Sequence, residues 1–348
     1  MLKVGIAGIG FMGWIHWLAY QKIEDVQVAA ICDLDTNRLA GDWTGIKGNF
    51  GPPGTKVDLS GVQCCNNLDE FCQLDFDLLD ICLPPDLHVT MIQRAARCGK
   101  HVFCEKPLAL DLQKCDEAVA ACSAANTILQ VGHVLPFFPE FQAALKIINS
   151  GDYGHLKIGH FKRIISDPVW LKHYYDPKKI GGPLMDLHVH DAHFIRLIAG
   201  MPSGVYSRGE SKNEVVSFCH SIFDFSDANT TIASSSGVIN QQGRPFTHGF
   251  EIQLEKATLH FEYAAVATGD ESMPLKIITD DGKVQLIELD SNDPVDAFIA
   301  EVREMVEHVQ QGKPSKILDG KLARDAIQIC QAEAKSVKQR ERIGLDSE

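Results

Sequence analysis

The chain has 348 residues, enough for two domains of ordinary size. Its 45% hydrophobic content is typical of a globular protein, and 46 acidic against 33 basic residues give a formal charge of −13. This acidic balance argues against a nucleic-acid partner, because such proteins usually present a basic surface. There is no apolar run of about 18 residues and no secretory signal pattern, so we expect a cytoplasmic protein without a membrane partner.

The first third of the chain alternates two kinds of pattern. Short apolar runs occupy residues 2–7, 26–32, 78–83, 101–104 and 128–131, and helix-like segments such as 13–22 and 87–98 lie between several of them. This alternation predicts parallel βαβ units. Residues 43–62 are rich in glycine and proline, and we interpret them as a loop insertion after the second strand.

The pattern changes after about residue 135, where strand candidates such as KIGHFKRIIS, VVSFCHSIFDF and ATLHFEY follow one another with short turns. Strands without intervening helices predict a mainly antiparallel sheet, and Asp280-Asp281-Gly282 is a hairpin signal. Helical spacing returns in AFIAEVREMVEHVQQG. We therefore predict an α/β protein with two domains, 1–132 and 133–348.

A glycine motif follows the first strand and opens the first helix. It reads Gly8-x-Gly10-x-x-Gly13, and Asp33 ends the second strand twenty residues after Gly13. This spacing is typical of a dinucleotide-binding Rossmann fold, in which the glycines allow a tight turn, close approach of the pyrophosphate and helix packing. Asp33 favours NAD over NADP, because a carboxylate there binds the ribose hydroxyls and repels a 2′-phosphate.

A second motif ends another predicted strand, at Glu105-Lys106-Pro107. Ligands of such sheets bind at the carboxyl ends of the strands, so Lys106 stands where a nicotinamide and its substrate would meet. The residues that we expect to contact the cofactor lie in the glycine motif or at the ends of these strands. They are Gly8, Gly10, Phe11, Met12, Gly13, Asp33, Leu83, Pro84, Pro85, His88, Glu105 and Lys106.

Histidines gather in GGPLMDLHVHDAHFIRLIAG, residues 181–200, which has helical spacing. On a helix, Asp186, His190 and His193 fall at i, i+4 and i+7 and share one face. Three interpretations remain open. In the first, Asp186 orients His190 as a general base; in the second, the three side chains bind a divalent metal; in the third, the histidines are structural. The eleven cysteines form no C-x-x-C pair, so we expect buried thiols, and we predict no metal.

These motifs resemble those of the glucose–fructose oxidoreductase / inositol dehydrogenase / rhizopine-catabolism (Gfo/Idh/MocA) family. The similarity rests on GIAGIGFMG, Asp33, GKHVFCEKPLA, GGPLMDLHVHD and DGKLARDAIQICQAEAKS. It implies an N-terminal Rossmann domain, an open and mostly antiparallel C-terminal sheet, a nicotinamide cofactor and sugar-like or polyol-like substrates. It also implies a homodimer or homotetramer joined through that sheet, a substrate-contacting role for Lys106, and Asp186 and His190 as the catalytic pair.

The chain departs from the family pattern at two positions. Pro136 stands where the family often has an arginine, and His193 stands where it often has an aspartate. We expect Lys162, Arg163 and Trp170 to line the substrate pocket, the two cations replacing the arginine. We expect His193 to face the substrate, with a structural role as the alternative.

The prediction is an NAD(P)-dependent dehydrogenase acting on a secondary alcohol of a sugar, cyclitol or sugar derivative. His190 is the expected base, Asp186 its orienter, and Lys106 the group that polarises the reacting oxygen. One alternative is a glycosidase or epimerase that uses a tightly held NAD for transient oxidation. Another is a non-catalytic sugar or dinucleotide sensor on the same fold.

Overall fold

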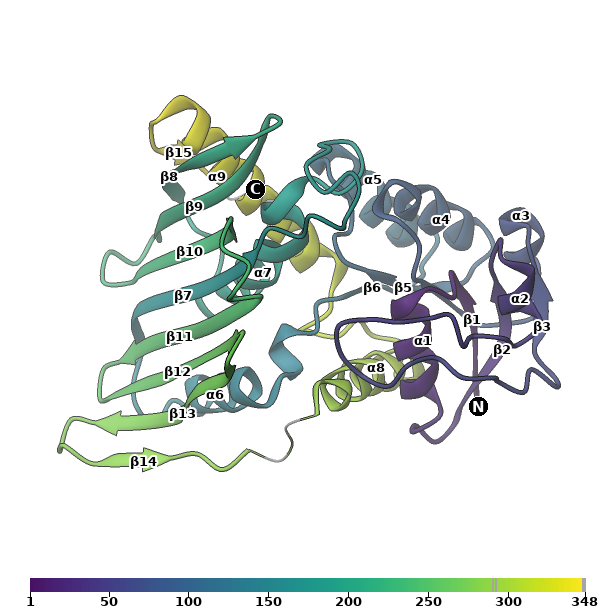
Figure 1. Ribbon diagram of the computed structural model, residues 1–348, viewed down its shortest axis with the longest axis horizontal. Helices are drawn as coiled ribbons and strands as arrows, with labels where there is room; N and C mark the ends of the chain where they lie inside the picture. Colours follow the sequence, from purple (N-terminus) through teal and green to yellow (C-terminus); the bar gives the residue numbers. More distant parts are fainter. Residues whose placement is uncertain (290, 292, 346–348) are drawn as a thin grey trace. The chain divides into compact units, whose positions relative to one another are not determined.

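The computed structural model describes residues 1–289, 291 and 293–345, and the chain divides into two compact units (Figure 1). The first unit comprises Met1–Phe138 and Ser291–Arg324, and the second comprises Pro139–Asp290 and Asp325–Glu348. The sequence predicts one boundary near residue 132. The structure differs because helix α8 (Pro294–Gln310) packs against α1 (Phe11–Tyr20) and so belongs to the first unit.

The first unit contains a six-stranded parallel sheet in the order β3-β2-β1-β4-β5-β6. This is the strand order of a doubly wound dinucleotide-binding fold, and it confirms the predicted α/β class. The central strands are buried on both faces, which explains their continuous apolar runs. The strands are β1 (Leu2–Ala7), β2 (Val26–Cys32), β3 (Gln63–Cys65), β4 (Leu78–Ile81), β5 (His101–Glu105) and β6 (Leu129–Gly132).

Helices of the first unit begin where the sequence supplies local signals. Pro85 lies in the first turn of α4, and Asp111 caps α5 by accepting the N–H of Lys114. Helix α1 differs, because Gly10 at its N-cap has no side chain to satisfy the first amides. The remaining elements of this unit are α2 (Thr36–Leu39), α3 (Leu68–Phe71), α4 (Pro85–Arg97), α5 (Leu112–Ala124) and the 3₁₀ turn η1 (Leu135–Phe137).

The glycine- and proline-rich segment 43–62 is anchored in the core of the first unit. Trp43 is fully buried, and its ring lies 5.0 Å from that of Trp17 and 5.7 Å from that of Trp14 on α1. The Trp14 indole donates to the carbonyl of Pro52 at 2.9 Å. Phe50 stacks on Phe298 of α8 at 5.1 Å. The segment is therefore an insertion with its own apolar anchors.

Replacing Trp43 by alanine should lower the free energy of unfolding of the first unit by about 3–5 kcal/mol, because a large buried ring is lost and a cavity remains. The change also removes the indole N–H that donates to the Arg38 carbonyl at 2.7 Å. Urea unfolding followed by fluorescence measures the effect. Thr44→Ala, at the exposed neighbouring position, is the control. Equal stability of the two variants would contradict this anchoring.

The second unit contains a nine-stranded sheet in the order β14-β13-β12-β11-β7-β10-β9-β8-β15. All neighbouring pairs are antiparallel except β7 and β10, which confirms a mostly antiparallel sheet. The predicted hairpin at 280–282 joins β13 to β14. The strands are β7 (Leu156–Ser166), β8 (Gly204–Lys212), β9 (Val215–Asp224), β10 (Thr231–Ile239), β11 (Phe246–Leu254), β12 (Ala257–Val266), β13 (Gly269–Thr279), β14 (Val284–Leu286) and β15 (Ile343–Gly344).

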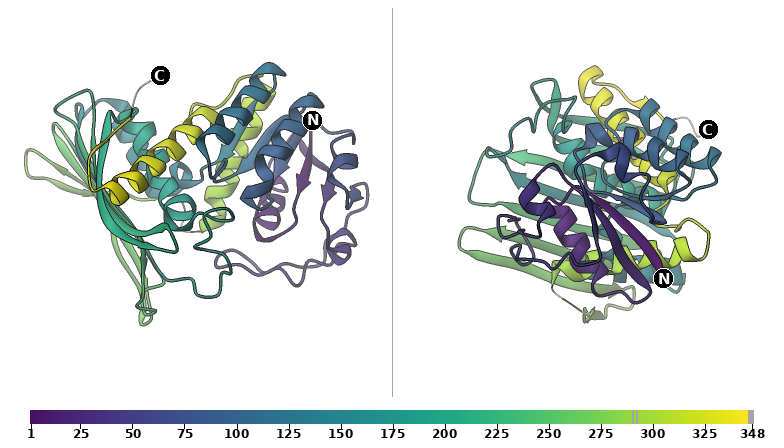
Figure 2. Two further views of the ribbon diagram at one scale, coloured as in Figure 1. Left: turned by 90° about the horizontal axis from the view of Figure 1, so that it is seen from above. Right: turned by 90° about the vertical axis from the view of Figure 1, so that its right-hand side faces the viewer.

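Helices cover one face of this sheet, as the left view of Figure 2 shows. They are α6 (Pro139–Ser150), α7 (Val189–Ala199) and α9 (Gly320–Gln339), whose first residues belong to the first unit. Phe141 of α6 and Phe194 of α7 meet edge to face at 5.1 Å, and both contact phenylalanines of the sheet. This aromatic cluster places α7, which carries the histidine segment, on the covered face.

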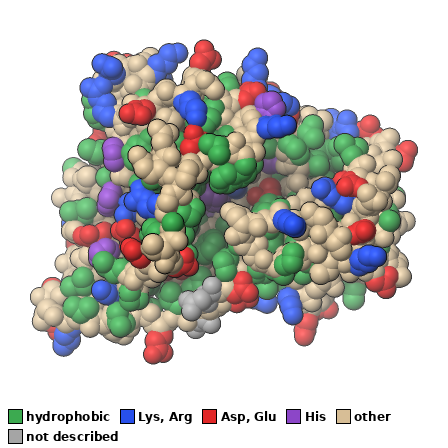
Figure 3. Space-filling model, in the orientation of Figure 1, with side chains coloured by type: hydrophobic (Ala, Val, Ile, Leu, Met, Phe, Trp, Pro, Cys, Tyr) green, Lys and Arg blue, Asp and Glu red, His purple; other side chains and the backbone are tan. Residues whose placement is uncertain are grey.

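The opposite face of the nine-stranded sheet is exposed. Ile158 and Ile222 are 45% and 52% exposed, and His160 and His220 point the same way at alternate strand positions. At the left of Figure 3, histidine and charged side chains are mixed with hydrophobic ones along this unit. Self-association through this face stays a prediction.

In the described part of the chain, no helix has the length and hydropathy required to span a bilayer.

Candidate functional site

The glycine motif has the geometry of a phosphate-binding turn. Gly8 has φ +92°, and a Cβ there would lie 2.6 Å from the carbonyl oxygen of Cys82. A Cβ on Gly13 would lie 2.1 Å from the carbonyl oxygen of Gly8, whereas one on Gly10 would meet no described atom within 4 Å. The turn is thus closed on two sides and open at Gly10. With the uncapped amides of α1, this opening fits a dinucleotide pyrophosphate.

Asp33 joins the end of β2 to the glycine turn. One carboxylate oxygen accepts the N–H of Ile9 at 2.7 Å, and the other accepts the N–H of Asp35 at 2.8 Å. Arg38 lies beside it, with Nη1 3.3 Å from Asp33 Oδ2 and Nε 3.6 Å from Asp35 Oδ2. The predicted ribose-binding carboxylate is therefore held at the turn, and a cation partly offsets the two acids.

Phe11 and Met12 follow the turn as the first residues of α1. The Phe11 ring meets Phe50 at 4.8 Å, and both side chains pack against the apolar core of the first unit. The backbone at Gly48 also lies directly against the Phe11 ring. These side chains fix the start of the helix, and their contacts with a cofactor stay a prediction.

His88 braces the ends of two strands. Its ring is fully buried, with Nδ1 2.9 Å from the carbonyl oxygen of Pro107 and Nε2 2.8 Å from that of Leu83. Both ring nitrogens face backbone carbonyl oxygens inside the protein, in contrast to the cofactor contact that we expect from sequence. Burial lowers the pKa of His88, so the neutral ring donates to one of these carbonyls at a time. Pro84 occupies the N-cap position of α4 without a capping hydrogen bond, and Pro85 begins the helix shortly after β4. The brace holds this turn beside the Glu105-Lys106-Pro107 turn.

Lys106 follows the last residue of β5. Its side chain is half-buried, its peptide bond to Pro107 is cis, and its backbone N–H donates to Glu105 Oε2 at 3.1 Å. The structure thus places Lys106 at the carboxyl end of a central parallel strand, as its position in the sequence predicts. In the first unit, the cofactor turn, Asp33 and Lys106 all lie at this end of the sheet, since each follows a strand's last residue.

The histidine segment of the second unit begins with one π-helical turn, η2 (Leu184–His188), before α7. The sequence predicts a regular helix here; the extra residue in the first turn is the difference, and such turns are frequent at functional sites. From Gly182 to Ile195, every residue is buried except Asp186 and His190. The structure thereby singles out the two polar side chains of the predicted catalytic pair as accessible.

Tyr174 accompanies Asp186, and our sequence reasoning missed it. Tyr174 is 2% exposed and lies in the segment between β7 and η2. Burial raises the pKa of Tyr174, and the charge of the nearby Asp186 raises this pKa further. The tyrosine therefore stays protonated and faces the Asp186 carboxylate. The Asp186–Tyr174 pairing has no sequence motif, because it depends on how the intervening segment folds back.

His188 and Asp191, the other polar members of the segment, belong to a buried ionic network. Arg163 of β7 binds Asp191 with two hydrogen bonds, of 2.7 and 3.1 Å, and His188 Nε2 lies 3.0 Å from Glu333 of α9. Burial alone would lower the pKa of His188, but Glu333 and then Asp191 raise it above its ordinary value. This network is structural and ties α7 to the sheet and to α9.

This network corrects one expectation about the substrate pocket. Arg163 is 5% exposed and committed to Asp191, so it is not available to a substrate. Its neighbour Lys162 projects from the opposite face of β7 and pairs with Glu262. The two cations therefore cannot line one pocket or jointly replace the arginine. Trp170 lies in a surface segment and is 69% exposed.

The structure also separates His193 from the accessible pair. His193 is fully buried, which supports the structural alternative. Among the described residues, one group of His, Cys, Asp or Glu side chains has donor atoms within 4.8 Å of one another, and it consists of His16, Asp80 and Cys82. Asp186, His190 and His193 form no such group, so this arrangement does not support the metal-binding alternative. Pro136 is buried in η1.

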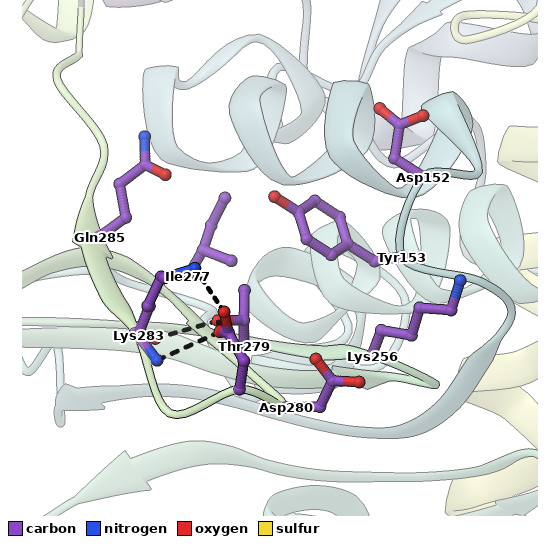
Figure 4. A pocket seen from close by; sticks show the side chains of 9 residues that line it. Asp152, Tyr153, Lys256, Ile277, Thr279, Asp280, Lys283 and Gln285 are labelled. Carbon is purple, nitrogen blue, oxygen red and sulfur yellow. Dashed lines mark hydrogen bonds and ion pairs between the residues drawn. The ribbon is translucent and has the colours of Figure 1, made fainter.

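A separate surface pocket of the second unit contains none of the predicted site residues (Figure 4). It lies by the β13–β14 hairpin, where Lys283 and Thr279 both contact Asp281. Its lining is Asp152, Tyr153, Lys256, Ile277, Thr279, Asp280, Asp281, Lys283 and Gln285. Thr279, Asp281 and Lys283 pair with one another in it, and we assign this pocket no role in catalysis.

Two family matches cover most of the chain. Residues 2–133 match the oxidoreductase family with an NAD-binding Rossmann fold, and residues 141–260 match the Gfo/Idh/MocA C-terminal domain. The chain belongs to the Gfo/Idh/MocA oxidoreductase family. The Gfo/Idh/MocA assignment confirms the resemblance and the two-domain fold that the motifs predict. It also confirms that the chain is an oxidoreductase of an NAD-binding family.

Relatives within the Gfo/Idh/MocA family include proteins of similar length. Inositol 2-dehydrogenase of Rhizobium meliloti is 24% identical over 99% of both chains. An uncharacterized oxidoreductase, YrbE, of Bacillus subtilis is 27% identical over 79% of this chain and 76% of its own. Among solved structures, levoglucosan dehydrogenase in complex with NADH and L-sorbose superposes with a TM-score of 0.80 at 18% identity, over 99% of each chain. At this identity the superposition shows the shared fold.

Proposed function

We propose that the protein is an NAD-dependent dehydrogenase that oxidises a secondary alcohol of a sugar, cyclitol or sugar derivative. The observation that carries the proposal is the exposure pattern of residues 182–195, where only Asp186 and His190 are accessible in an otherwise buried segment. An accessible carboxylate–imidazole pair is the arrangement that general base catalysis requires. The names of the relatives, inositol 2-dehydrogenase and levoglucosan dehydrogenase, support a polyol or sugar substrate.

The roles follow from the chemistry of each group. The His190 imidazole takes the proton of the substrate hydroxyl, and the Asp186 carboxylate orients the ring and stabilises the imidazolium that forms. The Lys106 ammonium stabilises the negative charge that develops on the substrate oxygen. A nicotinamide held by the glycine turn and Asp33 would supply the hydride acceptor for the substrate carbon that bears this oxygen, so the products would be a ketone, the reduced cofactor and a proton.

The experiment is a screen of sugars, cyclitols and sugar acids as substrates, in which the reduction of NAD is measured by the absorbance of NADH. The proposal expects at least one of these substrates to give stoichiometric NADH and a ketone. The segment 43–62, packed on Phe11 at the start of the cofactor helix, favours one alternative, a tightly held NAD that is reduced and reoxidised in each cycle. Nucleotide that remains bound through purification, with product formed but no net NADH, would identify that alternative.

The preference for NAD rests on Asp33. Replacing Asp33 by serine should lower the ratio of kcat/KM for NAD to that for NADP by about tenfold, which corresponds to about 1.4 kcal/mol. The reason is loss of the carboxylate that binds the ribose hydroxyls and repels a 2′-phosphate. Steady-state kinetics with both cofactors measure the ratio. Asp35→Ser is the control, because it removes a neighbouring charge that also contacts Arg38. A ratio unchanged in Asp33→Ser would contradict the preference.

A further inference from the structure

A buried cluster of titratable side chains lies in the core of the first unit, and the proposed mechanism does not use it. His16 of α1, Asp80 of β4 and Glu301 of α8 are fully buried, and Glu105 of β5 is 8% exposed. Tyr20 and Cys82 complete the cluster, with the Tyr20 hydroxyl donating to Asp80 at 2.9 Å and Cys82 Sγ 3.4 Å from His16 Nδ1. Four elements of the first unit thus place polar side chains around the imidazole ring of His16 in the buried core.

The His16 ring lies between two carboxylates. Nδ1 is 2.9 Å from Asp80 Oδ2, and Nε2 is 3.1 Å from Glu105 Oε1. Each nitrogen faces a carboxylate oxygen, so the ring donates from both sides when it is an imidazolium. The ring also stacks on Phe103 at 5.4 Å, which fixes its plane. These contacts hold His16 in one orientation.

The charges around the ring agree with this protonation state. Burial by itself would lower the pKa of His16, but the charge of Asp80 raises it well above its ordinary value. Burial, followed by the charge of Glu105, raises the pKa of Glu301, so this acid stays neutral. Tyr20 and Cys82 also stay protonated, because burial and Asp80 raise the pKa of both. One cation therefore faces the carboxylates of Asp80 and Glu105.

Glu105 connects this cluster to Lys106. Its Oε1 accepts from His16, and its Oε2 accepts the backbone N–H of Lys106 at 3.1 Å. His16 lies on the helix that begins at the glycine turn. A short chain of contacts thus runs from the cofactor helix, through the His16 ring and the Glu105 carboxylate, to the backbone of Lys106.

We propose that His16 is a positioning residue for Lys106: its ring holds the Glu105 carboxylate where that carboxylate fixes the Lys106 backbone. The inference rests on the proposed catalytic role of Lys106. Because α1 also forms the cofactor turn, the same contact sets the lysine relative to the glycine motif. A loss of this contact lets the Lys106 turn shift, and small displacements of a catalytic group have large effects on rate.

The test compares His16→Asn with Tyr20→Phe in the full-length protein. Asparagine cannot donate to both carboxylates across the ring's span, so turnover should fall about 10- to 100-fold while KM for the substrate and the NADH dissociation constant change by less than about threefold. Tyr20→Phe removes a hydrogen bond from the same buried Asp80 without touching Glu105, and it should keep turnover within about twofold. Equal losses in both variants would overturn the proposal, because they would reflect general damage to the core.

A second measurement does not depend on turnover. The rate at which trinitrobenzenesulfonate modifies Lys106, mapped by peptide mass spectrometry, should change at least about threefold in His16→Asn and stay at the wild-type rate in Tyr20→Phe. An unchanged rate in both would overturn the positioning role, even where no substrate is known. Absence of wild-type turnover on every sugar or polyol, with the labelling difference present, would instead count against the proposed function alone.

Metal analysis of the purified protein tests whether His16 is instead a metal ligand. His16, Asp80 and Cys82 have their donor atoms within 4.8 Å of one another, and a metal there would take the Nδ1 position that donates to Asp80. Bound zinc at one equivalent, lost in His16→Asn, would overturn the proposal, because the ring would then act as a ligand. The expected result is less than about 0.1 equivalent in both proteins.

Discussion

Replacing Lys106 by alanine should lower kcat by about 10²–10³-fold while the dissociation constant of NADH changes only a few-fold. Removal of one preorganised donor to a developing oxyanion has effects of this size. The ammonium is expected to act on the substrate oxygen more strongly in the transition state than before it, so kcat carries the loss. Steady-state kinetics and NADH fluorescence titration measure the two quantities.

Lys114→Ala is the matched control for this prediction. Lys114 is an exposed lysine on α5, a few residues after Lys106, and its loss should leave kcat unchanged. Lys106→Arg keeps the charge but not the compact ammonium, and it should recover only part of the rate. Wild-type kcat in Lys106→Ala would remove Lys106 from the reaction, and a lost NADH affinity with normal kcat would reassign it to cofactor binding.

Replacing His190 by alanine should lower kcat by about 10²–10⁴-fold, the usual contribution of a positioned general base. Because His190 is half-buried and accessible in a buried segment, imidazole added to the solution should restore part of the rate. Turnover is measured with and without imidazole at constant pH and ionic strength. Rescue distinguishes a missing base from a distorted helix.

His173→Asn supplies the control for the His190 variant. His173 is an exposed histidine of the second unit with φ +65°, a conformation that asparagine tolerates well. Its kcat should equal that of the wild type. The kcat of Asp186→Asn should lie between that of His190→Ala and that of His173→Asn, because the His190 base remains but loses its orienting carboxylate. A fully active His190→Ala would assign proton removal to another group.

The first unit was predictable to the extent that its function depends on local backbone geometry. Gly8, Gly13 and Asp33 act through a turn whose conformation is encoded within a few residues, and the structure has them in that geometry. Lys106 was predictable for a similar reason, since it follows a strand of a parallel sheet. In contrast, β3 has three residues and no apolar run to reveal it.

The polar networks could not be predicted, because their partners are distant in the sequence. His16 meets Glu105 across 89 positions, and Arg163 meets Asp191 across 28. Nothing in either local pattern distinguishes a buried charge from an exposed one. Arg163 is the example with the largest consequence, because strand alternation places it opposite Lys162 and removes both from one pocket.

The return of α8 to the first unit has a consequence for synthesis of the chain on the ribosome. About 150 residues separate Phe138 from Ser291, and both belong to the first unit. At roughly 5–20 residues per second, translation of that interval takes roughly 8–30 s. During this time the surface of α1 that Phe298 and Met305 later cover is exposed. The core of the first unit is therefore completed only after the strands of the second unit have been synthesised.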